Sequence, residues 1–272
     1  MNASPQKLPR RQRDRRLDFF RGLAMFIILI AHVPDDWWAL WIPARFGFSD
    51  GAEMFVFCSG MASALAFGSL FRSHGFGTLL ARVAFRVWQI YWAHISMFTA
   101  TMLVLLAGNQ LDTGVIYTQR LWVVPFLEDT ETFLPALLTL HYVPPLFDML
   151  PMYVVVLSML PIVALLGKIK PLYAGIWVGG LWLLSTTNMI DLSANPKEDI
   201  LWFFNPFGWQ LVFYTGFAFA MGWLKPPPIE RKYVLAALVF VLASVPFAYF
   251  RIFNAVPEIA AIRDAIEPLW AM

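Results

Sequence analysis

The chain has little charge and a single cysteine for its length. Of its 272 residues, 14% are charged and 59% are hydrophobic. A soluble globule of this size needs more polar surface than that, so the composition excludes an ordinary soluble domain. The lone Cys58 excludes an internal disulfide and a cysteine-cluster metal site. The formal net charge is only +2, and the basic residues gather in short patches beside apolar segments, which argues against nucleic-acid binding.

Several motifs of soluble enzymes are also missing from the sequence. It has no Walker-type phosphate loop, no glycine-rich dinucleotide fingerprint, no HExxH zinc motif and no serine elbow. We therefore expect no metal and no permanently bound cofactor. The basic N-terminus is followed by no small-residue cleavage site, so we expect an uncleaved first helix.

Long hydrophobic segments are abundant, and they predict an all-α transmembrane bundle. Crossing about 30 Å of hydrocarbon takes about 20 apolar residues. Roughly seven windows of the sequence meet this requirement. They are Leu17–Trp38, Ser49–Leu70, Leu79–Ala107, Leu146–Leu166, Leu172–Met189, Leu201–Leu224 and Tyr233–Phe250. We predict a basic tail over residues 1–16 and one integral-membrane domain over 17–272.

The segment Gly108–Tyr142 separates the third and fourth windows. Its stretch from Gln119 to Leu140 is apolar, but prolines and acidic residues interrupt it. We predict an interfacial or re-entrant segment here instead of a crossing.

The basic residues predict the orientation of the bundle. If the N-terminus is cytoplasmic, fifteen of the twenty lysines and arginines fall on inside segments and five on outside segments. This is a clear positive-inside bias, and it predicts a multi-pass membrane protein with a cytoplasmic N-terminus. The chain stops at EPLWAM, where another hydrophobic segment could begin, so we expect a truncated protein that lacks its last helices.

Arg21 and His32 are the most informative residues of the first window. They are eleven positions apart, which is about three helical turns, so both side chains point the same way, about 16 Å apart along the axis. Ionisable groups at such depth are costly in hydrocarbon and usually mark a functional site. We predict that this face of the helix forms part of a functional site, with His32 as a base.

Asp50 and Glu53 open the second window, three positions apart and on one helical face. A carboxylate beside an imidazole stabilises its charged form, so either residue could assist His32 in removing a proton from a hydroxyl. The alternative is structural, with Asp50 capping the helix and Glu53 pairing with an arginine.

Three further candidates lie in the third window. Arg82 and Arg86 are one turn apart at its cytoplasmic end, where guanidinium groups could bind the phosphates of a donor or simply anchor the helix. His94 lies two turns beyond Arg86 among tryptophans, as a substrate-binding residue or a packing residue.

In the second window, Cys58 and Ser59 are predicted to be small packing residues, because neither has a base nearby in sequence.

The remaining candidates lie near the predicted outer face. Asp148 precedes the fourth helix, where it could bind substrate or cap the helix. A group of amide and indole side chains that would suit a sugar is formed by Asn205, Trp209 and Gln210. The start of a helix within an aromatic belt would contain the same residue types. Gly216 and Gly222 are predicted to allow close helix packing.

These segments together resemble the OpgC proteins, a branch of the acyltransferase-three group of membrane enzymes. The similarity runs from about Arg13 to at least Leu224. It is carried by the blocks RRLDFFRGLAMFIILIAHVPDD, GFSDGAEMFVFCSGMASALAFG, RVWQIYWAH, LHYVPPLFDMLPMY and NPFGWQLVFYTGFAFAMG, in that order.

The resemblance implies transfer of an acyl group, succinyl in the best-known members, from a cytosolic coenzyme A thioester to hydroxyls of osmoregulated periplasmic glucans. The basic residue, ten intervening positions and histidine of the wider group map onto Arg21 and His32. The resemblance implies that His32 is the catalytic base that activates the acceptor hydroxyl, and that Arg21 binds substrate by steering the thioester or the phosphates of coenzyme A. The co-substrate would be succinyl-CoA, and the partners would be the glucan and the lipid bilayer of the bacterial inner membrane. The family typically has about ten spans, three more than the windows found here.

Three other readings stay open at the level of the sequence. The same architecture could use an acetyl donor or an acceptor in lipopolysaccharide or lipid. The buried ionisable residues could instead form the path of a transporter, although the two halves show no repeat. The chain could also be an inactive partner in a glucan-modifying complex. The oligomeric state is left open.

Overall fold

The computed structural model describes residues 14–111 and 114–266 and is helical throughout that part of the chain. Within those ranges no strand forms, apart from an isolated bridge between Ser193 and Leu201. The elements are α1 (Arg15–His32), η1 (Trp37–Leu40), η2 (Pro43–Arg45), α2 (Gly51–Ser63), η3 (Ala64–Gly68), α3 (Ser69–Gly108), η4 (Tyr117–Leu121), α4 (Val124–Glu128), α5 (Thr130–Leu138), α6 (Met149–Ile169), α7 (Pro171–Thr186), α8 (Pro206–Met221), α9 (Arg231–Ala248), α10 (Phe250–Phe253) and α11 (Pro257–Ile266). The predicted all-α class is therefore confirmed for the described residues, while most of the predicted basic tail lies outside them.

Each of the seven predicted windows contains a helix, but the number of membrane spans is not confirmed. Three helical stretches are long and apolar enough to cross a membrane, namely Gly51–Gly108, Met149–Ile169 and Arg231–Ala248. The helices α7 and α8 have 16 residues each, which corresponds to about 24 Å of rise. They are short for a hydrocarbon core of about 30 Å.

The first window extends beyond its helix. The helix α1 ends at His32, and Val33 is already extended at φ −80° and ψ 116°. Pro34 follows, and the residue before a proline is disfavoured in the α region. The predicted outer turns, up to Trp38, belong instead to a loop and to the 3₁₀-helix η1. His32 is therefore at the end of its helix.

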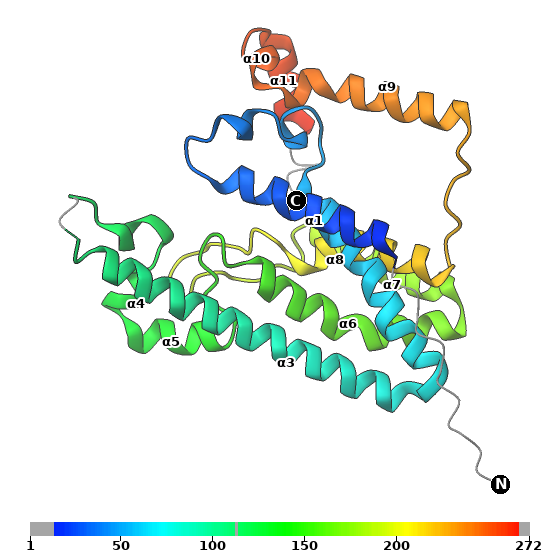
Figure 1. The fold of residues 1–272 in the computed structure, drawn as a ribbon, viewed down its shortest axis with the longest axis horizontal. Helices are drawn as coiled ribbons and strands as arrows, with labels where there is room; N and C mark the ends of the chain where they lie inside the picture. Colours follow the sequence, from blue (N-terminus) through cyan, green and yellow to red (C-terminus); the bar gives the residue numbers. More distant parts are fainter. Residues whose placement is uncertain (1–13, 112–113, 267–272) are drawn as a thin grey trace.

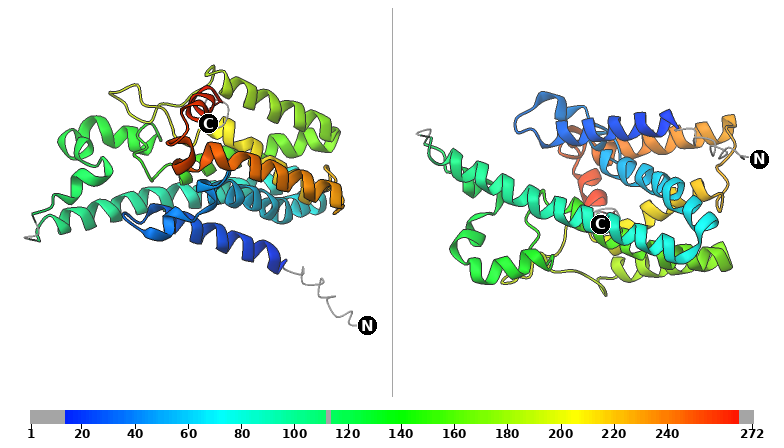
Figure 2. Two further views of the ribbon diagram at one scale, coloured as in Figure 1. Left: turned by 90° about the horizontal axis from the view of Figure 1, so that it is seen from above. Right: turned by 60° about the horizontal axis from the view of Figure 1, so that its bottom comes forward.

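The second and third windows are joined without a loop. The π-helical turn η3 continues α2 into α3, and the chain bends at Gly75, which has φ 82° and ψ −175°. A positive φ of this kind favours glycine. The helix α3 has 40 residues and runs along most of the molecule in both views of Figure 2.

The main hydrophobic core lies where α6 meets α2, α3 and α8 (Figure 1). Its fully buried members include Val56, Met152, Val156 and Phe213. The helices α2 and α8 approach each other closely through two glycines. A Cβ on Gly60 would lie 1.8 Å from the Phe213 carbonyl oxygen.

The second glycine of this contact is Gly216, where a Cβ would lie 2.1 Å from the carbonyl oxygen of Phe57. The predicted packing role of Gly216 is thus confirmed. The same prediction is wrong for Gly222, which ends α8 in the left-handed region at φ 75° and has open space around its Cα. It is a helix C-cap, a position where glycine is favoured because it lacks a Cβ.

The segment between α3 and α6 folds back against α3. Its helices η4, α4 and α5 have five to nine residues, too few to cross a bilayer, as predicted. An aromatic cluster holds the segment in place, in which Phe133 and Phe126 surround Tyr142. Burial raises the pKa of Tyr142 to about 12, and its hydroxyl donates to the carbonyl of Trp122.

An ion pair joins this segment to the loop before α8. Lys197 Nζ lies 2.5 Å from Asp129 Oδ2. Hydrogen bonds from Lys197 and Thr132 lower the pKa of the Asp129 carboxyl to about 2. The segment between α3 and α6 and the loop before α8 are therefore linked to each other.

The helix α9 lies apart from the other long helices (Figure 1). Only 6% of its apolar stretch is buried. It contacts the rest of the chain chiefly near the loop that follows α1, where the rings of Tyr249 and Phe46 stack at 5.4 Å.

Candidate functional site

Arg21 lies on α1 and faces α2. Its guanidinium carbon is 5.6 Å from the centre of the Phe55 ring, an arrangement typical of a cation–π contact. Its Nε is buried and forms no hydrogen bond with any described residue. Arg21 is thus half-buried against α2.

Tyr153, on α6, faces the same turn of α2. Its ring packs edge-on against Phe55, at 6.1 Å between centroids, and against Phe213 at 6.2 Å. The hydroxyl is close to Ser59, and Cys58 and Arg21 are within electrostatic range of it. The hydroxyl forms no hydrogen bond of acceptable geometry with Ser59 or with any other described residue. Sequence reasoning did not select Tyr153, and its only signal was a phenol inside an apolar helix.

His32 is exposed at the C-terminal end of α1. Its Nδ1 is 2.6 Å from the carbonyl oxygen of Ile28, so that nitrogen carries the proton when the ring is neutral. The other ring nitrogen, Nε2, is then the atom that can accept a proton. This is the protonation state that a general base requires.

Asp148 is a buried carboxylate within electrostatic range of His32. It is buried in the position immediately before α6 and makes no side-chain capping bond. Burial raises the pKa of the Asp148 carboxyl, while backbone hydrogen bonds and the charge of His32 lower it. The two predicted site residues are thus within electrostatic range of each other, although no hydrogen bond or ion pair between them is found among the described residues.

Asp50 and Glu53 form a capping box at the start of α2. The Glu53 carboxylate accepts a hydrogen bond from the backbone N–H of Asp50 at 2.7 Å. This matches the structural alternative for Asp50, and no described contact joins either residue to His32. Their predicted catalytic assistance to His32 stays a prediction.

His94 is completely buried, and neither of its ring nitrogens has a hydrogen-bond partner among the described residues. It shares the buried face of α3 with Val83 and Phe98, the face that packs on α6. Arg82 and Arg86 are exposed on the same helix. Arg86 donates to the side chain of Gln89 at 3.3 Å.

The predicted sugar-binding group is engaged within the protein. Asn205 caps α8 by accepting from the Phe207 N–H at 2.9 Å, and its amide donates to Asp191 at 2.7 Å. Gln210 is fully buried and donates to the carbonyl of Val178 at 2.8 Å. Trp209 is buried and packs on Phe204, with ring centroids 4.7 Å apart. These contacts join α8 to α7 and to the preceding loop.

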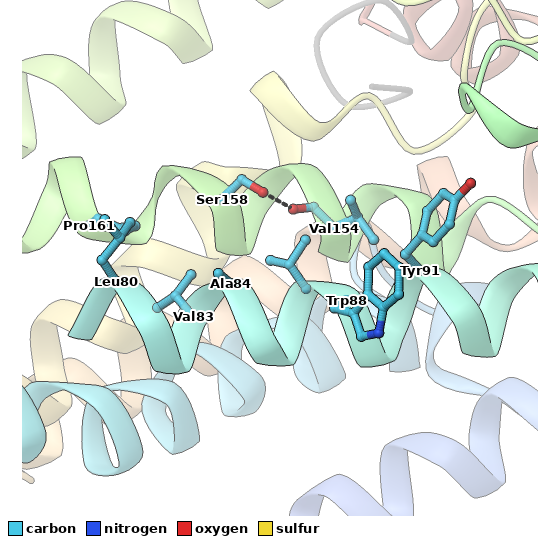
Figure 3. Close-up of a pocket in the computed structure, with 9 residues that line it drawn as sticks. Leu80, Val83, Ala84, Trp88, Tyr91, Val154, Ser158 and Pro161 are labelled. Carbon is cyan, nitrogen blue, oxygen red and sulfur yellow. Dashed lines mark hydrogen bonds between the residues drawn. The ribbon is translucent and has the colours of Figure 1, made fainter. Parts of the chain in front are cut away.

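A separate apolar groove of about 450 Å³ runs between α3 and α6 (Figure 3). Its walls are Leu80, Val83, Ala84, Val87, Trp88 and Tyr91 on α3 and Val154, Ser158 and Pro161 on α6. Its two hydroxyls are bound internally, because Ser158 donates to Val154 and Tyr91 donates to Leu138. None of the predicted site residues lines this groove.

The family model described as OpgC protein matches residues 13–270, nearly the whole chain. The chain belongs to the OpgC family. No curated protein and no solved structure matches it. In this OpgC-family chain the matched range contains Arg21, His32, Asp148 and Tyr153, and the resemblance found in the sequence blocks is confirmed.

Proposed function

We propose that this OpgC-family chain is an integral-membrane O-acyltransferase, a member of the acyltransferase-three group. It would move a succinyl group from cytosolic succinyl-CoA to a hydroxyl of a periplasmic glucan, in the bacterial inner membrane and with its N-terminus in the cytoplasm. The observation that carries the proposal is the family match over residues 13–270.

The proposed base is His32, supported by Asp148. Nε2 of His32 takes the proton from the acceptor hydroxyl as the hydroxyl oxygen attacks the thioester carbonyl. The new C–O bond forms, the C–S bond breaks, and the proton passes from the imidazole to the departing thiolate. The neighbouring Asp148 carboxylate stabilises the imidazolium that exists between these two steps.

The proposed donor route runs from the cytoplasmic side towards His32. The acyl donor is cytosolic and the acceptor is periplasmic, so the donor's long pantetheine arm must extend through the bundle. The exposed Arg82 and Arg86 are proposed to hold the phosphates of coenzyme A, because one guanidinium group can donate two parallel hydrogen bonds to phosphate oxygens. Arg21 lies deeper and would contact the arm itself.

The test is transfer of label from [¹⁴C]succinyl-CoA to periplasmic glucan by the purified protein in nanodiscs. We expect labelled glucan with wild type and a loss of about 10² to 10⁴ in rate for His32→Ala, the contribution typical of a general base. His74→Ala is the control, because His74 is exposed at the other end of the bundle beside Ser73. Full activity in His32→Ala would remove this residue from the mechanism. Glucan that stays unlabelled with wild type would refute the proposed reaction.

A further inference from the structure

Two buried hydrogen-bond donors on different helices are without acceptors. They are Nε of Arg21 on α1 and the hydroxyl of Tyr153 on α6. Phe55 of α2 contacts both residues, and Cys58 and Ser59 lie on the next turn of α2. Folded proteins rarely leave buried polar groups unpaired, because each one has given up its hydrogen bonds to water.

The chemistry of these two groups defines what they can bind. An arginine Nε can only donate, and a tyrosine hydroxyl without a partner can donate as well. No described carboxylate forms an ion pair with Arg21. The rings that pack on Tyr153, Phe55 and Phe213, are apolar, and Ser59 is the polar side chain near its hydroxyl. The fitting ligand atom is therefore an oxygen acceptor on an otherwise slender, largely apolar chain.

The distance along α1 identifies which oxygen this is. Arg21 precedes His32 by eleven residues, about 16 Å of helix rise. The reacting thioester must lie within about 3 Å of the hydroxyl that His32 deprotonates, so its carbonyl cannot also reach Arg21. In the pantetheine arm, the amide on the pantoate side is about 11 Å from the thioester carbonyl, the reach of three extended peptide units.

We propose that Arg21 and Tyr153 together form a subsite for the carbonyl oxygen of that second amide of the pantetheine arm. This inference rests on the proposed function, since it assigns the donor's path. The subsite would align the arm between α1, α2 and α6, with the thioester directed towards His32 and Asp148. Tyr153 is then a substrate-binding residue in addition to those the sequence predicted.

The decisive variant is Tyr153→Phe, which removes the hydroxyl and keeps the ring against Phe55 and Phe213. Because this hydroxyl has no partner, the melting temperature should not fall. The matched control is Tyr214→Phe, whose buried hydroxyl donates to the Val156 carbonyl at 2.6 Å. That variant should melt at a lower temperature while its KM values stay those of wild type.

Three donors then locate the contact along the arm. Succinyl-CoA and succinyl-pantetheine contain the second amide, whereas succinyl-N-acetylcysteamine lacks it. For Tyr153→Phe we expect KM to rise about fivefold to tenfold with the first two donors, the effect of one lost hydrogen bond, and to be unchanged with the third. An equal rise with all three donors would put the contact nearer the thioester. A rise with succinyl-CoA alone would put it at the phosphates. Either result, or no rise at all, overturns the subsite.

Binding of unacylated coenzyme A, measured by calorimetry in nanodiscs, separates this inference from the proposed function. If wild type binds no coenzyme A, the proposed function fails and the subsite fails with it. If wild type binds coenzyme A and Tyr153→Phe binds it equally well, only the subsite is refuted. Weaker binding by Tyr153→Phe, with Tyr214→Phe unchanged, supports both.

Discussion

At the scale of single residues, Asp148 is the side chain whose role the structure changes most. The sequence placed it before a helix as a possible cap, yet it makes no side-chain capping bond. Instead it lies within electrostatic range of His32, which belongs to a helix more than a hundred residues earlier. A buried carboxylate within range of an imidazole favours the charged imidazolium.

We therefore expect Asp148→Asn to lower kcat by about tenfold to a hundredfold with little effect on the KM for the donor. The amide keeps the size of the side chain and removes its charge. Since burial raises the pKa of Asp148, the wild-type carboxyl becomes neutral before an exposed one would as the pH falls. The deficit of the variant relative to wild type should therefore shrink towards acid pH.

Rates of acyl transfer measured between pH 5 and pH 8 test this expectation. Asp36→Asn is the control, because Asp36 caps the nearby helix η1 through the Trp38 N–H at 3.0 Å and forms no hydrogen bond or ion pair with a histidine in the described structure. If Asp148→Asn kept the wild-type rate at pH 8, the carboxylate would have no part in the reaction.

Sequence spacing could predict the site only where its residues share one helix. Arg21 and His32 were found because an eleven-residue interval places them on one face of α1. The capping box of Asp50 and Glu53 was also predictable, since an acidic N-cap with glutamate three residues later is a local sequence signal. The placement of Asp148 within electrostatic range of His32, and of Tyr153 within that of Arg21, depends on how α1 and α6 are arranged around α2, which no interval in the sequence encodes.

At the scale of elements, the contact between α2 and α8 depends on two glycines that lack room for a methyl group. Gly60→Ala would place a Cβ 1.8 Å from a backbone carbonyl oxygen, and Gly216→Ala would place one at 2.1 Å. Backbone atoms cannot move aside as a side-chain end can, so the two helices would have to separate.

We expect each of these variants to destabilise the protein by about 3 kcal/mol or more, at or beyond the upper end of the usual cost of overpacking. Gly179→Ala on α7 is the control, because nothing lies within 4 Å of its Cβ position. That change should be neutral or stabilising by up to about 1 kcal/mol, the difference in helix propensity. Melting temperatures of the three variants in detergent provide the measurement, and an unchanged value for Gly60→Ala would contradict the close contact.

The helices themselves were largely predictable from hydropathy, whereas their ends and joints were not. The windows for α6, α7 and α9 differ from the observed helices by only a few residues, because apolar composition alone determines them. The first window overran its helix because Pro34 stops the helix inside an apolar run. The joint between α2 and α3 was missed because helix continues through residues 64–74 to the bend at Gly75.

At the scale of the whole molecule, the direction of each helix determines what the site can reach. The helices α1 and α6 must run in opposite directions for Arg21 to lie near Tyr153 while His32 lies near Asp148. That arrangement agrees with the threading predicted from the basic residues, in which the first span runs outward and the fourth runs inward. His32 and Asp148 would then face the periplasmic side, where the acceptor is.

The predicted threading requires the short helix α7 to cross the membrane. It has 16 residues, about 24 Å, so crossing requires the bilayer to thin or the flanking side chains to extend to the interface. Such mismatch costs only fractions of a kcal/mol per Å, and Lys170 stands at its cytoplasmic end under the predicted orientation. We therefore predict that α7 crosses and separates Lys170 from Asp199.

Single cysteines in a Cys58→Ala background test this prediction with a membrane-impermeant maleimide on intact spheroplasts. Lys170→Cys and Ser73→Cys should react only after permeabilisation, while Asp199→Cys and Ser49→Cys should react at once, since all four positions are exposed in the structure. Labelling of Lys170→Cys and Asp199→Cys from the same side would mean that α7 does not cross. Immediate labelling of Ser73→Cys with protection of Ser49→Cys would invert the first helix, placing His32 on the cytoplasmic side, out of reach of a periplasmic glucan.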